Sequence, residues 1–200
     1  MNNSSLSGYL LPGSPPVLQG TLTLSQFIQT VLVGVSGLSG EFVRPNWQPA
    51  PPKQPDLSVN WLAFGIESST PAANSFVGID PTGQTENVYS QRHETLEVQC
   101  SFYGPASYDL MTIVRDGFQV QQNLASLTAA KMGFTEIGPA THIPDLVNER
   151  WIDRWQASIF LQRMIQRTYP ILTFLSVSGT IDAESPGGTE FRSNFSATVP

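Results

Sequence analysis

A long run near the C-terminus, from Arg150 to Tyr169, most constrains how this chain can fold. It contains no glycine and no internal proline, it closes at Pro170, and its bulky Trp, Ile, Phe and Tyr residues favour extended chain. Successive residues of a strand face opposite sides, and here one set is largely apolar while the other is mostly polar. Ordinary strands run for about 5–6 residues. The run therefore predicts a long strand that projects beyond its domain core towards a partner, which favours assembly over a self-contained enzyme.

The composition is that of a globular protein with an acidic surface. The 200 residues are 40 % hydrophobic and only 13 % charged, and the formal net charge is −6. A nucleic-acid binder that works by counterion release needs a basic stripe, which this chain lacks. No apolar run reaches the ~18 residues of a membrane span, and the first residues lack the basic region of a signal peptide. The single cysteine, Cys100, excludes an internal disulfide.

The chain divides by composition into a central domain and two ends. Residues 1–20 are rich in Ser, Gly and Pro and are expected to form a flexible N-terminal arm. Residues 21–177 are expected to form one domain, and residues 178–200 to form a C-terminal tail with scattered apolar residues. A tail of this kind can gain order on a partner by adding a strand to an exposed sheet edge.

Two segments have the apolar spacing of amphipathic helices. The first opens at Thr23, which fits a capping box, and the glycines of a Gly-x-x-Gly-x-x-Gly series end it, namely Gly34, Gly37 and Gly40. These glycines follow a helix rather than a strand, so a phosphate-binding loop is the weaker interpretation. The second helix covers roughly residues 106–122 and contains Gly117 as a weak point. A shorter helical piece is expected at residues 124–131.

The remaining apolar segments read as strands or extended chain. Strands are expected at 61–67, 76–79, 92–103 and 134–137, besides the long run. The proline-rich segment 41–60 is expected to be extended surface chain pinned by Trp47. Runs of neighbouring strands between helices predict an α+β fold, a small antiparallel or mixed sheet flanked by two main helices in the order α-β-β-α-β-β, with extended N- and C-terminal arms.

No combination of residues forms a recognisable catalytic, cofactor or metal site. The two histidines, His93 and His142, fall short of the three or four clustered ligands that a metal site needs. Cys100 lies in an apolar alternation and lacks the neighbouring base of a nucleophile. We therefore expect no enzyme activity, no catalytic residue, no cofactor and no metal.

Aromatic residues and arginines are the candidates for contacts between subunits, because Trp, Tyr and Arg dominate binding hot spots. Packing in the core is the alternative for the tryptophans, and a solvated strand end is the alternative for Arg163 and Arg167. The candidates are Arg44, Trp47, Trp151, Asp153, Trp155, Arg163, Arg167 and Tyr169.

Four short segments, taken together in their order along the chain, carry a family resemblance. They are GEFVRPNWQPAPP at 40–52, FYGP at 102–105, RDG at 115–117 and RTYP at 167–170. With these segments the chain, over about residues 30–177, resembles the neck or tail terminator proteins of contractile-tailed bacteriophages. The resemblance implies a small sheet flanked by helices. It also implies a homohexameric ring that caps the tail tube and sheath and joins the tail to the head-neck connector.

The resemblance further implies which partners and which location to expect. The partners are copies of the chain, tail tube and sheath proteins, and connector or collar proteins, in a virion assembled in the host cytoplasm. The net charge of −6 suggests an acidic lumen through which genomic DNA passes without sequence-specific binding. Candidate lumen acids are Glu67, Asp80, Glu86, Glu94, Glu97, Asp109 and Asp116. Another tail or collar subunit, or an unrelated soluble binding module, is the alternative interpretation.

Overall fold

The predicted strands assemble, together with two short strands that were not predicted, into one mixed sheet. Its strands are β1 (Val43–Pro45), β2 (Trp61–Pro71), β3 (Phe76–Asp80), β4 (Asn87–Tyr103), β5 (Met132–Ile137), β6 (Thr141–His142) and β9 (Arg154–Pro170). In the computed structural model of the chain, the strand order is β1-β2-β4-β9-β5, with β3 paired to β4 and β6 paired to β9. Strand β1 runs parallel to β2, whereas β2 is antiparallel to β4 and β5 is antiparallel to β9. The predicted α+β fold with a mixed sheet is confirmed.

The structure describes residues 9–13, 21–80, 87–147, 149–171, 176–184 and 190–198. These residues group into two compact units. The larger unit lies within residues 14–77 and 90–167, and the smaller lies within residues 1–13, 78–89 and 168–200. The domain boundaries expected at residues 20 and 177 stay a prediction.

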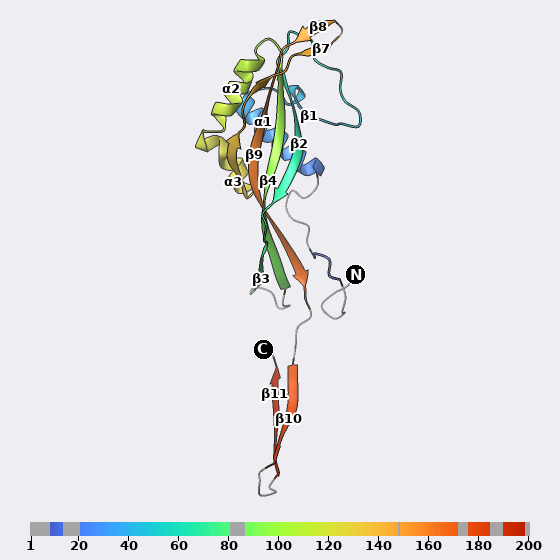
Figure 1. Cartoon of the computed structure of the whole chain (residues 1–200), viewed down its shortest axis with the longest axis vertical. Coiled ribbons are helices and arrows are strands. Elements are labelled where there is room, and N and C mark those ends of the chain that lie inside the picture. The colour runs from blue at the N-terminus through green and yellow to red at the C-terminus, as the bar shows by residue number, and fades with distance from the viewer. Residues whose placement is uncertain are drawn as a thin grey trace. The chain divides into compact units, whose positions relative to one another are not determined.

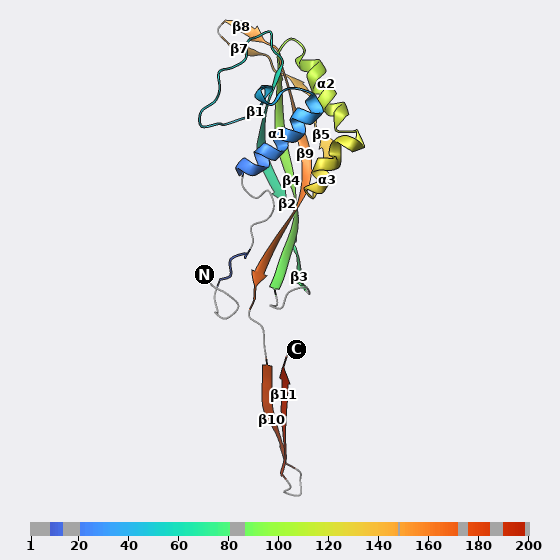
Figure 2. The same cartoon turned by 180° about the vertical axis from the view of Figure 1, so that it is seen from behind.

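Three α-helices of the described chain cover one face of the sheet in the larger unit. They are α1 (Thr21–Ser36), α2 (Ser107–Gly117) and α3 (Ala125–Ala129). The short 3-10 turn η1 (Gly40–Phe42) lies between α1 and β1, and η2 (Gln121–Leu124) lies between α2 and α3. Figures 1 and 2, which view the sheet from opposite sides, place the helices together on the same face. Alternate residues of β4 point to this face and are fully buried, among them Leu96, Val98 and Phe102. Burial of each such side chain contributes roughly 1.5–3 kcal/mol.

The helix ends differ from their predicted positions for local reasons. Helix α1 begins at Thr21, ahead of the predicted cap at Thr23, and it ends at Ser36. Gly37 follows in the left-handed region with φ +72°, which confirms the predicted glycine end. Helix α2 stops at Gly117 instead of running on to about residue 122. A Cβ on Gly117 would lie 2.6 Å from Cγ1 of Val35, so the glycine lets the two helices approach closely.

The prediction of one uninterrupted strand over residues 150–169 is wrong at Asp153. Residues before it form β8 (Arg150–Ile152), which pairs with β7 (Asp145–Val147) in a separate hairpin. Residues after it form β9 in the main sheet, where the predicted alternation holds and Ala157, Ile159 and Leu161 are buried. Aspartate is uncommon in strands, and hydrogen bonds to the side chain of Asp153 keep this residue out of the backbone pairing of the main sheet.

The C-terminal residues contain more structure than the predicted tail. Strands β10 (Ser176–Glu184) and β11 (Glu190–Thr198) form their own antiparallel two-stranded sheet, drawn at the red end of the chain in Figure 1. The N-terminal arm lies largely outside the described residues. Within the smaller unit, the amide of Gly13 donates to the carbonyl oxygen of Thr168 at 2.8 Å.

Candidate subunit interface

A row of aromatic and guanidinium groups lies on the sheet face opposite the helices. Trp61 and Tyr103 are register partners on β2 and β4, and their rings stack with centroids 4.2 Å apart and planes 6° apart. The guanidinium of Arg44 lies 5.7 Å from the Trp61 ring centroid, and that of Arg154 lies 5.9 Å from the Tyr103 centroid. Each cation–π contact is worth about 0.5–1 kcal/mol at an exposed site. The row runs Arg44, Trp61, Tyr103, Arg154.

The two arginines of this row are held in different ways. Arg154 forms an ion pair with Asp145 at 2.9 Å and donates from Nε to the carbonyl oxygen of Ile143 at 3.0 Å. Arg44 donates from Nε to the carbonyl of Glu41 at 2.7 Å and from Nη1 to the carbonyl of Lys53 at 2.8 Å. Within the described part of the chain, Arg44 has no carboxylate in ion-pair contact. Among the described residues, its charge is therefore fixed in position but is not neutralised by a carboxylate.

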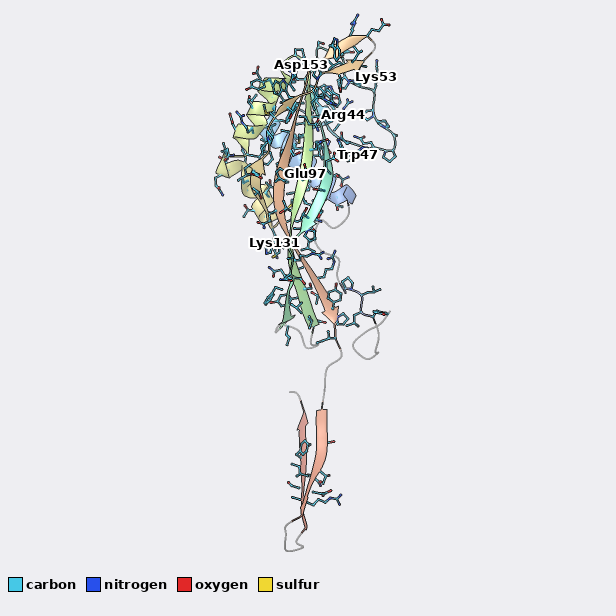
Figure 3. All side chains as sticks on the ribbon, viewed as in Figure 1. Arg44, Trp47, Lys53, Glu97, Lys131 and Asp153 are labelled. Atoms are coloured by element: carbon cyan, nitrogen blue, oxygen red, sulfur yellow. The ribbon has the colours of Figure 1, made fainter. Side chains whose placement is uncertain are left out.

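A groove of about 370 Å³ borders this row. Its walls come from the proline-rich segment and from β7, and its floor includes Trp61, Ala63 and Tyr103. Trp47 stands at the groove with 72 % of its surface exposed and with a left-handed backbone, φ 54°. Its ring covers Gly65 so closely that a Cβ there would lie 2.7 Å from the indole. Figure 3 shows Arg44, Trp47 and Lys53 on the side where the proline-rich segment runs.

The β7–β8 hairpin, which borders the groove, presents an exposed apolar pair on its face away from the groove. Leu146 and Trp151 are register partners in this hairpin, and they are 59 % and 70 % exposed. The neighbouring residues Asp145 and Val147 line the groove itself. Exposed apolar groups that adjoin one another mark surfaces that other proteins bind. We define the docking surface as this pair together with the groove.

Asp153 joins a cluster at the start of α2. The buried hydroxyl of Ser107 donates to Oδ2 of Asp153 at 2.9 Å, and Nε2 of His142 bonds the other carboxylate oxygen. The His142 hydrogen bond holds the pKa of Asp153 below its ordinary value, and the Ser107 hydrogen bond acts in the same direction. The His142 ring stacks on Trp155 at 4.8 Å, and Tyr108 contacts Trp155 at the same centroid distance.

The cluster holds the residue types of a serine hydrolase in an unsuitable order. A nucleophilic serine needs a histidine base at its hydroxyl. Here the carboxylate of Asp153 stands between Ser107 and His142, and Ser107 is fully buried. The cluster therefore joins the β8–β9 break to α2 and offers no nucleophile–base pair. Burial also raises the pKa of the Cys100 thiol, which makes it a poor nucleophile.

Further along β4 and β9, charges pair within the chain. Arg163 forms an ion pair with Glu94, and both side chains are largely buried. Glu97 accepts hydrogen bonds from Ser158 at 2.9 Å and from Ser68 at 3.1 Å. Glu94 and Glu97, two of the proposed lumen acids, are thus engaged with other side chains. A third, Asp116, pairs with Arg115 at 3.2 Å, and a fourth, Glu86, lies outside the described residues.

The structure brings only some of the predicted interface residues together. Arg44 and Trp47 line the groove, and Trp151 lies on the adjoining hairpin. Asp153 and Trp155 belong to the cluster at α2, while Arg163 and Arg167 lie further along β9. Tyr169 is half-buried in the smaller unit. The expectation that these residues contact other subunits stays a prediction.

Sequence reasoning missed Trp61 and Tyr103, which form the centre of the row. Each stands at the end of a predicted strand, Trp61 at its start and Tyr103 at its finish. Antiparallel pairing of these two strands, with β3 between them in the sequence, would bring those ends together. The available signal was therefore the pairing of strand ends, which needs the register of β2 against β4.

The architecture is of the α+β class. In the described part of the chain, no group of residues is arranged to hold a metal ion, and no helix is long and apolar enough to cross a membrane. The family model described as phage neck terminator protein matches residues 22–184. The chain belongs to this family, and the resemblance seen in the sequence is confirmed. A search of curated proteins finds no match.

Proposed function

We propose that this protein closes the end of a contractile phage tail as a homohexameric ring. The ring caps the tail tube and sheath and joins the tail to the head-neck connector. The family match over residues 22–184 carries this proposal, because it spans most of the chain. The protein acts by assembly geometry, with no catalytic step and no cofactor. It is a virion component that assembles in the host cytoplasm.

The docking surface supports a role in assembly. Trp47 and Trp151 are 72 % and 70 % exposed, and exposed tryptophans are favoured anchors at protein interfaces. Arg44 adds a fixed positive charge that fits a carboxylate on a neighbouring subunit or tail protein. A head-to-tail contact of this kind closes into a ring when its rotation permits.

The net charge bears on passage of the genome. Each copy has a formal charge of −6, and a ring lumen that carries part of this charge repels DNA phosphates. Genomic DNA then passes without sequence-specific binding. A ring whose lumen is neutral or basic would contradict this part of the proposal.

The first test is the mass of the purified protein by light scattering, with negative-stain images of the same sample. We expect closed rings made of six copies of the 21.8 kDa chain, either free or after incubation with tail tubes. Open polymers of the chain would favour a tube or other tail component instead. A monomer that leaves tail tubes uncapped would overturn the proposal.

A matched pair of variants tests the docking surface. Arg44→Glu reverses a charge at the groove, whereas Arg115→Glu reverses an exposed charge on α2, whose ion-pair partner is the adjacent Asp116. We expect Arg44→Glu to reduce ring formation and Arg115→Glu to leave it unchanged. Equal ring formation by both variants would exclude the groove as a subunit contact.

A further inference from the structure

The C-terminal hairpin has strand edges without a partner. Strands β10 and β11 pair over nine register positions, and in the described chain each pairs with no other strand (Figure 1). One edge of each strand is therefore free. A two-stranded hairpin is marginally stable at best in water, and three or more strands are needed for independent stability. The free edges are templates for further pairing.

The register of the hairpin separates polar from apolar positions. One face carries the pairs Ser178–Ser196, Thr180–Asn194 and Asp182–Arg192, and the other carries Gly179–Phe195 and Ile181–Ser193. Ile181 and Phe195 are 57 % and 47 % exposed. The hairpin is thus an amphipathic ribbon.

Three contacts fix this register. The Phe195 ring lies over Gly179, where a Cβ would come within 2.8 Å of two ring atoms. On the polar face, Thr180 donates to Oδ1 of Asn194 at 2.8 Å, and Arg192 pairs with Asp182 at 2.9 Å. Because its register is fixed, the hairpin of every copy presents the same groups in the same order along a given free edge.

We propose that hairpins of neighbouring copies pair edge to edge, β10 of one copy antiparallel to β11 of the next. The inference rests on the proposed assembly into a ring and names how its copies are linked. If neighbouring copies repeat the register that pairs Asp182 with Arg192 within a copy, Asp182 of one copy lies beside Arg192 of the next, and opposite charges alternate across the strands. It also keeps the apolar positions on one side.

Charge favours contact between unlike edges. In the register centred on these residues, symmetric pairing of two β10 edges would set Asp182 opposite Asp182, and symmetric pairing of two β11 edges would set Arg192 opposite Arg192. Like charges directly opposite each other in a sheet are destabilising. Contact between unlike edges is head-to-tail, which is the type of contact that repeats and can close into a ring.

Cysteine cross-linking tests the pairing in the full chain. Asp182→Cys and Arg192→Cys are co-expressed as two variants that differ in a size tag, and the assembled protein is oxidised mildly. Both side chains are well exposed, and Cys100 is buried, so the new thiols react without competition. We expect disulfides between the two variants to exceed those within either variant several-fold. An excess of like-with-like disulfides would overturn the pairing.

The matched control moves the second cysteine by one residue. Ser193→Cys lies next to position 192 but on the other face of the ribbon, so its disulfide with Asp182→Cys should be lost. Equal cross-linking by both combinations would mean random collision and would overturn the proposal.

The same samples are imaged to separate this inference from the proposed function. Rings without the mixed disulfide would overturn hairpin pairing and leave the ring intact. The mixed disulfide in open particles that never close on tails would overturn the ring and support hairpin pairing. The absence of both rings and disulfides would overturn both.

Discussion

Trp61 and Tyr103 occupy directly opposed positions on adjacent strands, and their rings lie nearly parallel at 4.2 Å. The pair joins the start of β2 to the end of β4, next to the point where the chain turns into α2. It also forms part of the groove floor. The stack therefore serves both the stability of the sheet and the shape of the docking surface.

Loss of either ring of this stack should reduce stability. We expect Trp61→Ala or Tyr103→Ala to lower the free energy of unfolding by about 1–3 kcal/mol, because both side chains are only half-buried. A double-mutant cycle followed by urea unfolding should give a coupling of about 0.5–1.5 kcal/mol. Strict additivity of the two losses would show that the stacking itself contributes nothing.

Gly104 should tolerate no side chain. It has φ +107°, and a Cβ there would lie 2.5 Å from Oδ1 of Asn60 and 2.6 Å from the carbonyl oxygen of Val59. We expect Gly104→Ala to cost more than about 2 kcal/mol of unfolding free energy. Gly133→Ala is the matched control, since a Cβ there meets no atom within 4 Å, and it should change stability by less than about 1 kcal/mol. Similar losses in both variants would refute the steric explanation.

Asp153 should make stability depend on acid pH. Its folded pKa is lowered, chiefly by the hydrogen bond with His142, relative to about 3.9 in the unfolded chain. Its contribution is therefore fully present above that unfolded value and is lost as the pH falls through the lower folded pKa. Unfolding free energies measured between about pH 6 and 2 should fall less steeply for Asp153→Asn than for the native chain. Identical slopes would show that the carboxylate is not linked to folding.

Two tryptophans near the β8–β9 break should respond differently to truncation. Trp151 is 70 % exposed, so Trp151→Ala should change stability by less than about 0.5 kcal/mol while weakening assembly. Trp155 packs against Tyr108 and His142, so Trp155→Ala should lower the melting temperature. Calorimetry and light scattering on both variants distinguish the two effects. Unimpaired assembly of Trp151→Ala would remove it from the interface.

Cys100 should be inert in the folded protein. Its side chain is fully buried, and burial raises the pKa of the thiol far above the physiological range. We expect no labelling by a maleimide in native buffer and complete labelling in denaturant. Rapid native labelling would reveal local opening of the sheet around β4.

The sequence predicted which faces of the helices and strands are buried better than it predicted where those elements end. Alternation in β4 and helical spacing in α1 identify their buried faces, because a strong period needs no knowledge of distant residues. The break at Asp153 depends on Ser107 and His142, both distant in sequence, so no local pattern reveals it. The candidate site was found in part, since Arg44 and Trp47 were predicted whereas their partner Trp61 required the strand register.

The C-terminal hairpin was missed although its signal is local. Polar and apolar residues alternate on both sides of Pro186-Gly187-Gly188, a combination that favours two strands joined by a turn. The apolar members are small or widely spaced, so the segment as a whole is polar in composition, which favours a tail. Period was the better guide here than composition.

The groove is assembled from chain segments that are far apart in the sequence. Arg44, Trp61, Tyr103 and Asp145 meet there only after β2, β4 and the β7–β8 hairpin have taken their final places. An incompletely folded copy consequently has no groove to offer. We expect that only fully folded copies join a growing particle, because incompletely folded copies lack the binding surface. No separate proofreading protein is then needed to exclude the incompletely folded copies.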